Sequence, residues 1–137
     1  MSFTQYNELI SAASAARLLA YAPYSGFKVG AALVTKAGKI YTGCNVENLS
    51  LGLTICAERS AIATAIAQGS RDFVAIAVVT EGKKPAIPCG ACRQVLAEFN
   101  PSMKVMTATI DGKVEEFGLA ELLPFPAQGI LEGSRDV

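Results

Sequence analysis

The chain has 137 residues, with 12 basic and 12 acidic side chains that give a formal net charge of zero, and it contains no histidine. Apolar residues make up 51% of it and charged residues 18%, which is typical of one globular domain rather than of a disordered chain. The even charge balance leaves no basic surface of the kind that binds nucleic acid or anionic membranes. We therefore expect a single domain over residues 1–137 that acts on a small neutral molecule, with no nucleic acid and no membrane as partner.

Two further features concern the compartment in which the protein works. The first eight residues lack the basic region and apolar run of a secretory signal, and no apolar run reaches the roughly 18 residues of a membrane span. The four cysteines include a C-x-x-C pair. In a cytosolic chain of this size such a pair indicates metal or redox chemistry more often than a disulfide. We expect a cytoplasmic protein.

The spacing of apolar residues alternates along the chain between the periods of helix and strand. Pro23 and Gly26 end the first helix, since a proline cannot continue the hydrogen-bond ladder. The nearly unbroken apolar run 73–79 is typical of a strand buried on both faces. In chain order, the sequence predicts a helix over 4–20, strands over 27–35 and 39–46, a helix over 54–68 capped by Thr54 or its neighbour, a strand over 73–79, a helix over 90–99, strands over 103–110 and 113–117, and a short helix over 119–123.

This order of elements predicts the fold class. Strand–helix–strand units across residues 40–110 favour right-handed crossovers and a parallel centre, whereas the opening hairpin must be antiparallel. We expect an α/β fold, a three-layer α/β/α sandwich with a mixed five-stranded sheet and helices on both faces. The helix over 54–68 is rich in alanine, so it is thin enough to lie close to that sheet.

Two short segments, Cys56-Ala57-Glu58-Arg59 and Pro88-Cys89-Gly90-Ala91-Cys92-Arg93, carry the candidate chemistry. In the absence of histidine, three thiolates are the soft-metal ligand set that the chain offers. Three protein ligands leave one tetrahedral position of a zinc ion open, which is the arrangement of catalytic rather than structural zinc. We therefore expect one Zn²⁺ per chain, with the ligands Cys56, Cys89 and Cys92.

Glu58 is the candidate acid–base group. It follows Cys56 by two residues, a turn of about 200° on a regular helix, so the two can share a site only at the start of a helix. Two helix N-termini would then meet at the metal and favour thiolate over thiol. Three thiolates over-neutralise Zn²⁺, and Arg59 is the obvious cation to donate hydrogen bonds to the sulfurs, with Arg93 a second candidate. Glu58 would move protons between water and a leaving group.

Other interpretations of these residues stay open at this point. A lone C-x-x-C is as often half of a structural zinc site or a redox pair. Cys44 could supply a fourth thiolate, although its place in an apolar strand is typical of a small buried side chain. An acid in the first turn of a helix is often only a partner of the helix dipole. A non-catalytic, zinc-stabilised module is therefore the alternative from another class, but it would have no use for Glu58.

C-x-E followed by P-C-x-x-C is the zinc deaminase signature, here with cysteine in place of the first histidine. At these residues the sequence resembles the small, homotetrameric, zinc-dependent cytidine deaminases of the three-cysteine type. The likeness covers nearly the whole chain, in blocks that include Tyr21-Ala22-Pro23-Tyr24-Ser25, Phe27-Lys28-Val29-Gly30-Ala31-Ala32, Gly43-Cys44-Asn45-Val46-Glu47-Asn48, Cys89-Gly90-Ala91-Cys92-Arg93-Gln94 and Glu121-Leu122-Leu123-Pro124.

The resemblance implies a function and a set of roles. The function is hydrolysis of cytidine or deoxycytidine to the uridine product and ammonia, as in pyrimidine salvage, with Glu58 moving protons to N3 and to the leaving amine. Asn45 and Glu47 would hold the ribose hydroxyl, Phe27 would pack against the base, and the backbone of Ala57 would hydrogen-bond the base edge. Without the resemblance, Asn45 and Glu47 read as a solvated strand end and Phe27 as a core aromatic. The family also implies a homotetramer with sites shared across interfaces.

Two positions depart from the family pattern. Members commonly carry a tyrosine where Leu51 stands, and an aromatic where Ala127 stands. Both changes remove bulk from the expected pocket wall, so we predict a more open site that tolerates substituted cytidines or binds plain cytidine more weakly. A deaminase of a larger cytosine nucleoside, of the blasticidin type, is the alternative within the same chemistry, although Arg59 and the ribose pair favour cytidine. A polynucleotide editor is opposed by the zero net charge.

Overall fold

The structure is a computed structural model that describes residues 1–127, so residues 128–137 of the predicted domain lie outside the described part. Each predicted helix and strand is present, with ends that differ by a few residues. The elements are α1 (Phe3–Arg17), β1 (Val29–Thr35), β2 (Ile40–Cys44), the 3-10 turn η1 (Leu51–Leu53), α2 (Ala57–Ala67), β3 (Phe73–Thr80), α3 (Gly90–Phe99), β4 (Lys104–Thr109), β5 (Val114–Gly118) and α4 (Leu119–Leu122).

The five strands form one mixed sheet in the order β2-β1-β3-β4-β5. The β1–β2 hairpin is antiparallel, as predicted, and β1 also pairs antiparallel with β3. Strands β3 and β4 are parallel neighbours, and β5 returns antiparallel to β4. The predicted parallel centre is therefore limited to β3 and β4. Strands β2 and β3 do run in the same direction, but β1 lies between them.

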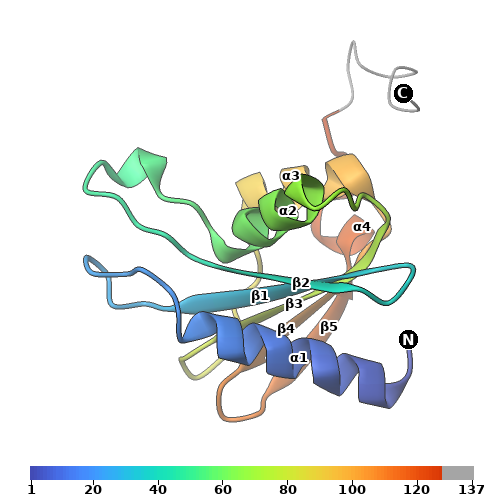
Figure 1. The fold of residues 1–137 in the computed structure, drawn as a ribbon, viewed down its shortest axis with the longest axis horizontal. Coiled ribbons are helices and arrows are strands. Elements are labelled where there is room, and N and C mark those ends of the chain that lie inside the picture. The colour runs from blue at the N-terminus through green and yellow to red at the C-terminus, as the bar shows by residue number, and fades with distance from the viewer. Residues whose placement is uncertain (128–137) are drawn as a thin grey trace.

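Helix α1 covers one face of the sheet, and α2, α3 and α4 cover the other (Figure 1). Each face has its own buried apolar cluster, and β3 contributes to both, as expected of a strand buried on two sides. The structure confirms the predicted three-layer α/β/α sandwich with a mixed five-stranded sheet. Within residues 1–127, no helix combines the length and the hydropathy that a membrane crossing requires.

Helix α2 lies against β2 with its backbone nearly in contact with the strand. A Cβ built at Gly43 would lie 2.3 Å from the backbone nitrogen of Ala61 and 2.7 Å from the carbonyl oxygen of Ala57. Ala57 and Ala61 are fully buried at this contact. The small residues on both sides therefore set how closely the start of α2 approaches β2. The first turn of α2 carries the predicted acid–base residue, Glu58.

Candidate active site

The three predicted metal ligands meet where α2 and α3 begin. Cys56 is the N-cap of α2 (φ −71°, ψ 154°) and Cys89 is the N-cap of α3 (φ −65°, ψ 167°), so both precede the regular helical turns. Cys92 lies in the first turn of α3 and is buried. The predicted cap Thr54 lies upstream of the helix instead, where its hydroxyl accepts a hydrogen bond from the backbone nitrogen of Asn48 (3.2 Å).

The sulfur atoms of this group fit a zinc ion. All three lie within 4.8 Å of one another, and those of Cys89 and Cys92 are 3.5 Å apart. A tetrahedral ion with Zn–S bonds of about 2.3 Å separates its sulfurs by about 3.8 Å, close to these spacings. Cys44 is half-buried at the end of β2 and is not part of the group found among residues 1–127. The donor set is thus three thiolates rather than four, which suits a catalytic zinc.

The two predicted cations behave differently. Arg59 places Nη2 3.5 Å from Sγ of Cys56 and 3.4 Å from the carbonyl oxygen of Thr54, as expected of a donor to the thiolates. Arg93 points elsewhere, because its Nε donates to the carbonyl oxygen of Pro88 (2.7 Å) and its Nη1 to that of Leu122 (3.2 Å). Arg93 therefore fixes the segment before α3 against α4 and does not serve the sulfurs.

Charge and burial set the protonation of the site in the metal-free protein. The pKa of the Cys56 thiol is lowered to about 5, because its sulfur accepts hydrogen bonds from Cys92 and Arg59. The pKa of Cys92 is raised by the same hydrogen bond to Cys56 and by burial. The pKa of Glu58 is raised as well, chiefly because the carboxyl is buried, with 6% of the residue exposed. A carboxyl that accepts a proton readily is suited to acid–base catalysis.

A cavity of about 200 Å³ opens beside this centre. Four of the predicted site residues line it, Phe27, Asn45, Ala57 and Glu58, together with the metal ligands Cys56 and Cys89. Glu47 is not among the lining residues. The sequence did not single out the contribution of β3 and of the loop before α3, which supply Val78, Thr80, Ala86 and Ile87. The apolar run of β3 predicts burial and the loop carries no motif, so neither indicates that these residues face a cavity.

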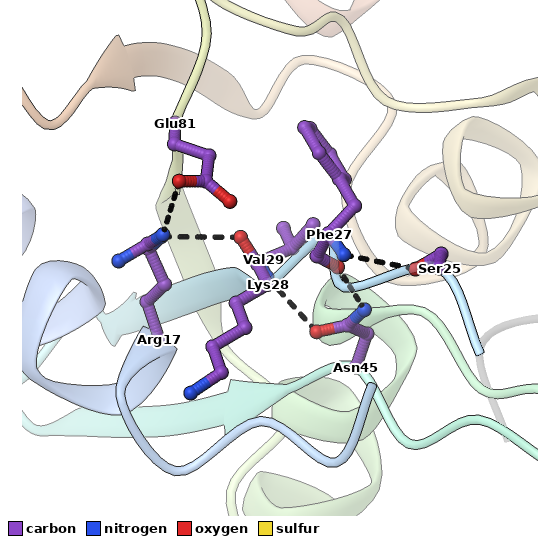
Figure 2. A network of polar contacts seen from close by, with 7 residues as sticks. All are labelled: Arg17, Ser25, Phe27, Lys28, Val29, Asn45 and Glu81. Atoms are coloured by element: carbon purple, nitrogen blue, oxygen red, sulfur yellow. Dashed lines mark hydrogen bonds and ion pairs between the residues drawn. The ribbon is translucent and has the colours of Figure 1, made fainter. Parts of the chain in front are cut away.

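The side chain of Asn45 hydrogen-bonds the backbone of the segment that forms part of the pocket wall (Figure 2). Its Oδ1 accepts from the backbone nitrogen of Val29 (2.9 Å), and its Nδ2 donates to the carbonyl oxygen of Phe27 (2.8 Å). Both partners line the cavity, and Asn45 is buried between them and β2. Asn45 therefore holds the wall in place and keeps one Nδ2 hydrogen for another acceptor.

Glu47 supports the same wall from farther away. One carboxylate oxygen accepts from the backbone nitrogens of Tyr24 (2.9 Å) and Ser25 (3.1 Å), and the other accepts from the Ser25 hydroxyl (2.5 Å). These bonds, led by that of the hydroxyl, lower the pKa of Glu47. The Ser25 hydroxyl in turn accepts from the backbone nitrogen of Phe27 (2.9 Å), as Figure 2 shows. Glu47 thus fixes the segment that presents the aromatic ring.

Arg17 is a functional support that the sequence did not reveal. It is the last residue of α1 and nearly buried, and its Nε donates to the carbonyl oxygen of Lys28 (3.2 Å), between Phe27 and Val29. Its Nη2 forms an ion pair with Glu81 (3.3 Å), the first residue after β3 (Figure 2). Arg17 therefore joins the segment of Phe27 and Val29 to the end of β3, and both contribute residues to the cavity wall.

Three thiolates that fit a zinc ion, a buried carboxyl whose pKa is raised, and an adjoining cavity in a three-layer fold define a zinc-dependent hydrolytic enzyme. The model of the cytidine and deoxycytidylate deaminase zinc-binding region matches residues 3–109. The chain therefore belongs to the cytidine and deoxycytidylate deaminase family.

Similar proteins agree with this family. A cytidine deaminase of Halalkalibacterium halodurans is 53% identical over 117 residues, which cover 85% of this chain and 89% of that protein. The crystal structure of the cytidine deaminase from Burkholderia pseudomallei superposes with a TM-score of 0.87 at 52% identity, covering 93% of this chain and all of the other. The Mycobacterium tuberculosis cytidine deaminase reaches a TM-score of 0.77 at 40% identity, with 88% and 95% covered. The predicted family, fold, zinc cofactor and enzyme class are confirmed.

Proposed function

We propose that this protein hydrolyses cytidine and deoxycytidine to uridine and deoxyuridine with release of ammonia. The observation that carries this proposal is that the three-cysteine group lies beside the cavity whose wall includes Cys56, Cys89 and the buried Glu58. Zinc, when bound, lowers the pKa of water so that a nucleophile is available near neutral pH. Glu58 would carry one proton from the attacking water to N3 of the base, and would then carry the second proton, from the new hydroxyl at C4, to the leaving amine, for which its raised pKa is suited.

Four further residues would bind the nucleoside. Ala57 is the first residue of α2, where a backbone N–H has no partner within the helix, so it is free to donate to the base edge. Phe27 forms an apolar wall for the base. Asn45 has an Nδ2 hydrogen left for the ribose hydroxyl, and Glu47 would accept from the same hydroxyl while its hydrogen bonds to Tyr24 and Ser25 hold the segment of Phe27.

The exposed apolar side chains around η1 favour a partner subunit. Leu49, Leu51 and Leu53 are 78%, 71% and 67% exposed, on a segment that projects beyond the sheet (Figure 1). Apolar surface of this kind is typical of an interface. We infer a homotetramer in which this segment approaches a neighbouring site. Light scattering should give about 57 kDa, four times the chain mass of 14.3 kDa, and a monomer in solution would contradict the inference.

The substrate range follows from the same segment. Leu51 does not line the cavity of its own chain, and a leucine there offers a neighbouring site less bulk than a tyrosine. We infer that substituted cytidines are accepted along with plain cytidine. A loss of about tenfold or more in kcat/KM for every N4- or 5-substituted analogue, about 1.4 kcal/mol, would contradict this. A deaminase of a larger cytosine nucleoside is the second candidate, and the same substrate panel separates the two.

A role in cytoplasmic pyrimidine salvage fits these features. All four cysteines are free, and three of them must stay reduced to bind zinc, which suits a reducing compartment. Detection of the protein in a secreted or periplasmic fraction would contradict this location.

The test of the reaction compares the wild type with Glu58→Gln. Ultraviolet absorbance follows the conversion of cytidine, and the zinc content of each protein is measured alongside. We expect the variant to keep about one zinc per chain and to lose roughly 10²–10⁴ in rate. Glu98→Gln is the matched control, because Glu98 is exposed on α3 and does not line the cavity. A wild type that holds zinc but leaves cytidine and deoxycytidine unchanged would overturn the proposal.

A further inference from the structure

Two threonine hydroxyls are buried in the sheet without a hydrogen-bond partner among the described residues, those of Thr80 and Thr107. Thr80 is 1% exposed and Thr107 is fully buried. A buried hydroxyl without a partner is costly, and native proteins rarely keep one without a reason. The two residues differ in one respect, because Thr80 lines the cavity beside Glu58 and Thr107 does not.

Their positions make the two threonines a matched pair. Thr80 is the last residue of β3, and Thr107 lies in the adjacent parallel strand β4, with Val78 opposite Thr107 in the register. Strand alternation places Thr80 on the face of Val78 and Thr107 on the face of Val105. Both valines belong to the apolar cluster under α2 and α3. The two threonines therefore lie on the same face of the sheet, beside the same apolar cluster. They differ in that Thr80 lines the cavity and Thr107 does not.

The other polar side chains in the cavity wall already have tasks. Asn45 is hydrogen-bonded to the backbone of β1, and the hydroxyl of Thr54 accepts from the backbone of Asn48. The cysteines and Glu58 form the metal centre and the acid–base group. Among the described lining residues, the hydroxyl of Thr80 is thus the neutral polar side-chain group that makes no hydrogen bond within the protein.

We propose that the Thr80 hydroxyl is a specificity-determining group that hydrogen-bonds a polar atom of the pyrimidine base, directly or through one buried water. This inference rests on the proposed nucleoside substrate. A hydroxyl both donates and accepts, so it can serve an amino, carbonyl or ring-nitrogen atom of the base. Since Val78 and Ile87 line the same cavity with apolar surface, a base that lacks the matching atom leaves the hydroxyl unpaired and is rejected.

The test compares Thr80→Val, Thr107→Val and Thr80→Ser with the wild type. Each valine variant replaces an unpaired hydroxyl by a methyl group, so both should melt at or above the wild-type temperature. Calorimetry of uridine binding to the zinc-loaded proteins and kcat/KM for cytidine report on the ligand. We expect Thr80→Val to lose about tenfold in both, mainly through KM, while Thr107→Val stays within about twofold. Thr80→Ser should recover most of the loss.

The outcomes separate this inference from the proposed function. If Thr80→Val binds uridine and turns over cytidine as Thr107→Val does, the hydroxyl has no role in recognition and the inference is overturned. Equal losses in both valine variants would also overturn it, because they would point to a general effect of changes in this layer. If the wild type itself does not deaminate cytidine, the proposed function fails, whatever the threonine variants do.

Discussion

Replacing Gly43 by alanine should displace helix α2, which begins at the metal ligand Cys56 and carries Glu58. The new Cβ would lie 2.3 Å from the backbone nitrogen of Ala61, whereas ordinary contacts begin at 3.4 Å, so the gap to be opened is about 1 Å. The obstructing atoms are backbone and cannot rotate away. The carbonyl oxygen of Ala57 would lie only 2.7 Å from the new Cβ, so the shift reaches the first turn of α2, next to Cys56 and Glu58.

The size of the effect follows from the precision that catalysis needs. Overpacking of this kind costs about 1–3 kcal/mol of stability. A misplacement of about 1 Å costs on the order of 10²-fold in rate. We therefore expect Gly43→Ala to melt several degrees lower and to lose about 10²-fold in kcat/KM for cytidine, with a reduced zinc content. The assays are thermal unfolding, ultraviolet kinetics and metal analysis of the purified protein.

Gly118→Ala is the control for this experiment. A Cβ at Gly118 would meet only the flexible carboxylate of Glu121, at 3.4 Å, and Gly118 does not line the cavity. This variant should keep its activity within about twofold and lose about 1 kcal/mol or less. If Gly43→Ala matched Gly118→Ala in rate, zinc content and melting temperature, the close contact between α2 and β2 would not control the geometry of the metal centre.

Two further predictions concern buried charge. Arg17→Met should lower the free energy of unfolding by about 1–3 kcal/mol in a denaturant titration, because the carbonyl oxygen of Lys28 loses its donor. Glu81→Gln should lower it by less than about 1 kcal/mol, since Glu81 is half exposed, and equal losses in the two variants would contradict this. Burial raises the pKa of Glu58 above its ordinary value of 4.5, because the buried site favours the neutral carboxyl. In the metal-free protein the neutral carboxyl therefore contributes to folding stability below pH 4.5, and this contribution is lost as pH rises through the folded-state pKa. The melting temperature of metal-free Glu58→Gln should therefore exceed that of the wild type by a margin that grows from acidic to neutral pH, and a constant margin would rule out this origin.

Much of the site could be predicted from the sequence because its chemistry is local. The thiolates come from two short segments, and the absence of histidine leaves cysteine as the soft ligand. The two-residue spacing of Cys56 and Glu58 required a helix start, and the structure places Cys56 at the N-cap. Apolar periodicity likewise predicted each helix and strand, since burial of one face imposes that pattern on neighbouring residues. The roles of Phe27, Asn45, Glu47 and Ala57 stay predictions until substrate binding is measured.

The tertiary structure alone decided what depends on residues far apart in the chain. Periodicity does not reveal which strands become neighbours, so the insertion of β1 between β2 and β3 was not predicted. The ion pair of Arg17 with Glu81 and the place of Thr80 in the cavity wall arise from that insertion, because it brings β1 beside the end of β3. Residue types and spacing are set along the chain, whereas pockets and supporting hydrogen bonds are set by packing between distant segments, and only the folded arrangement brings those together.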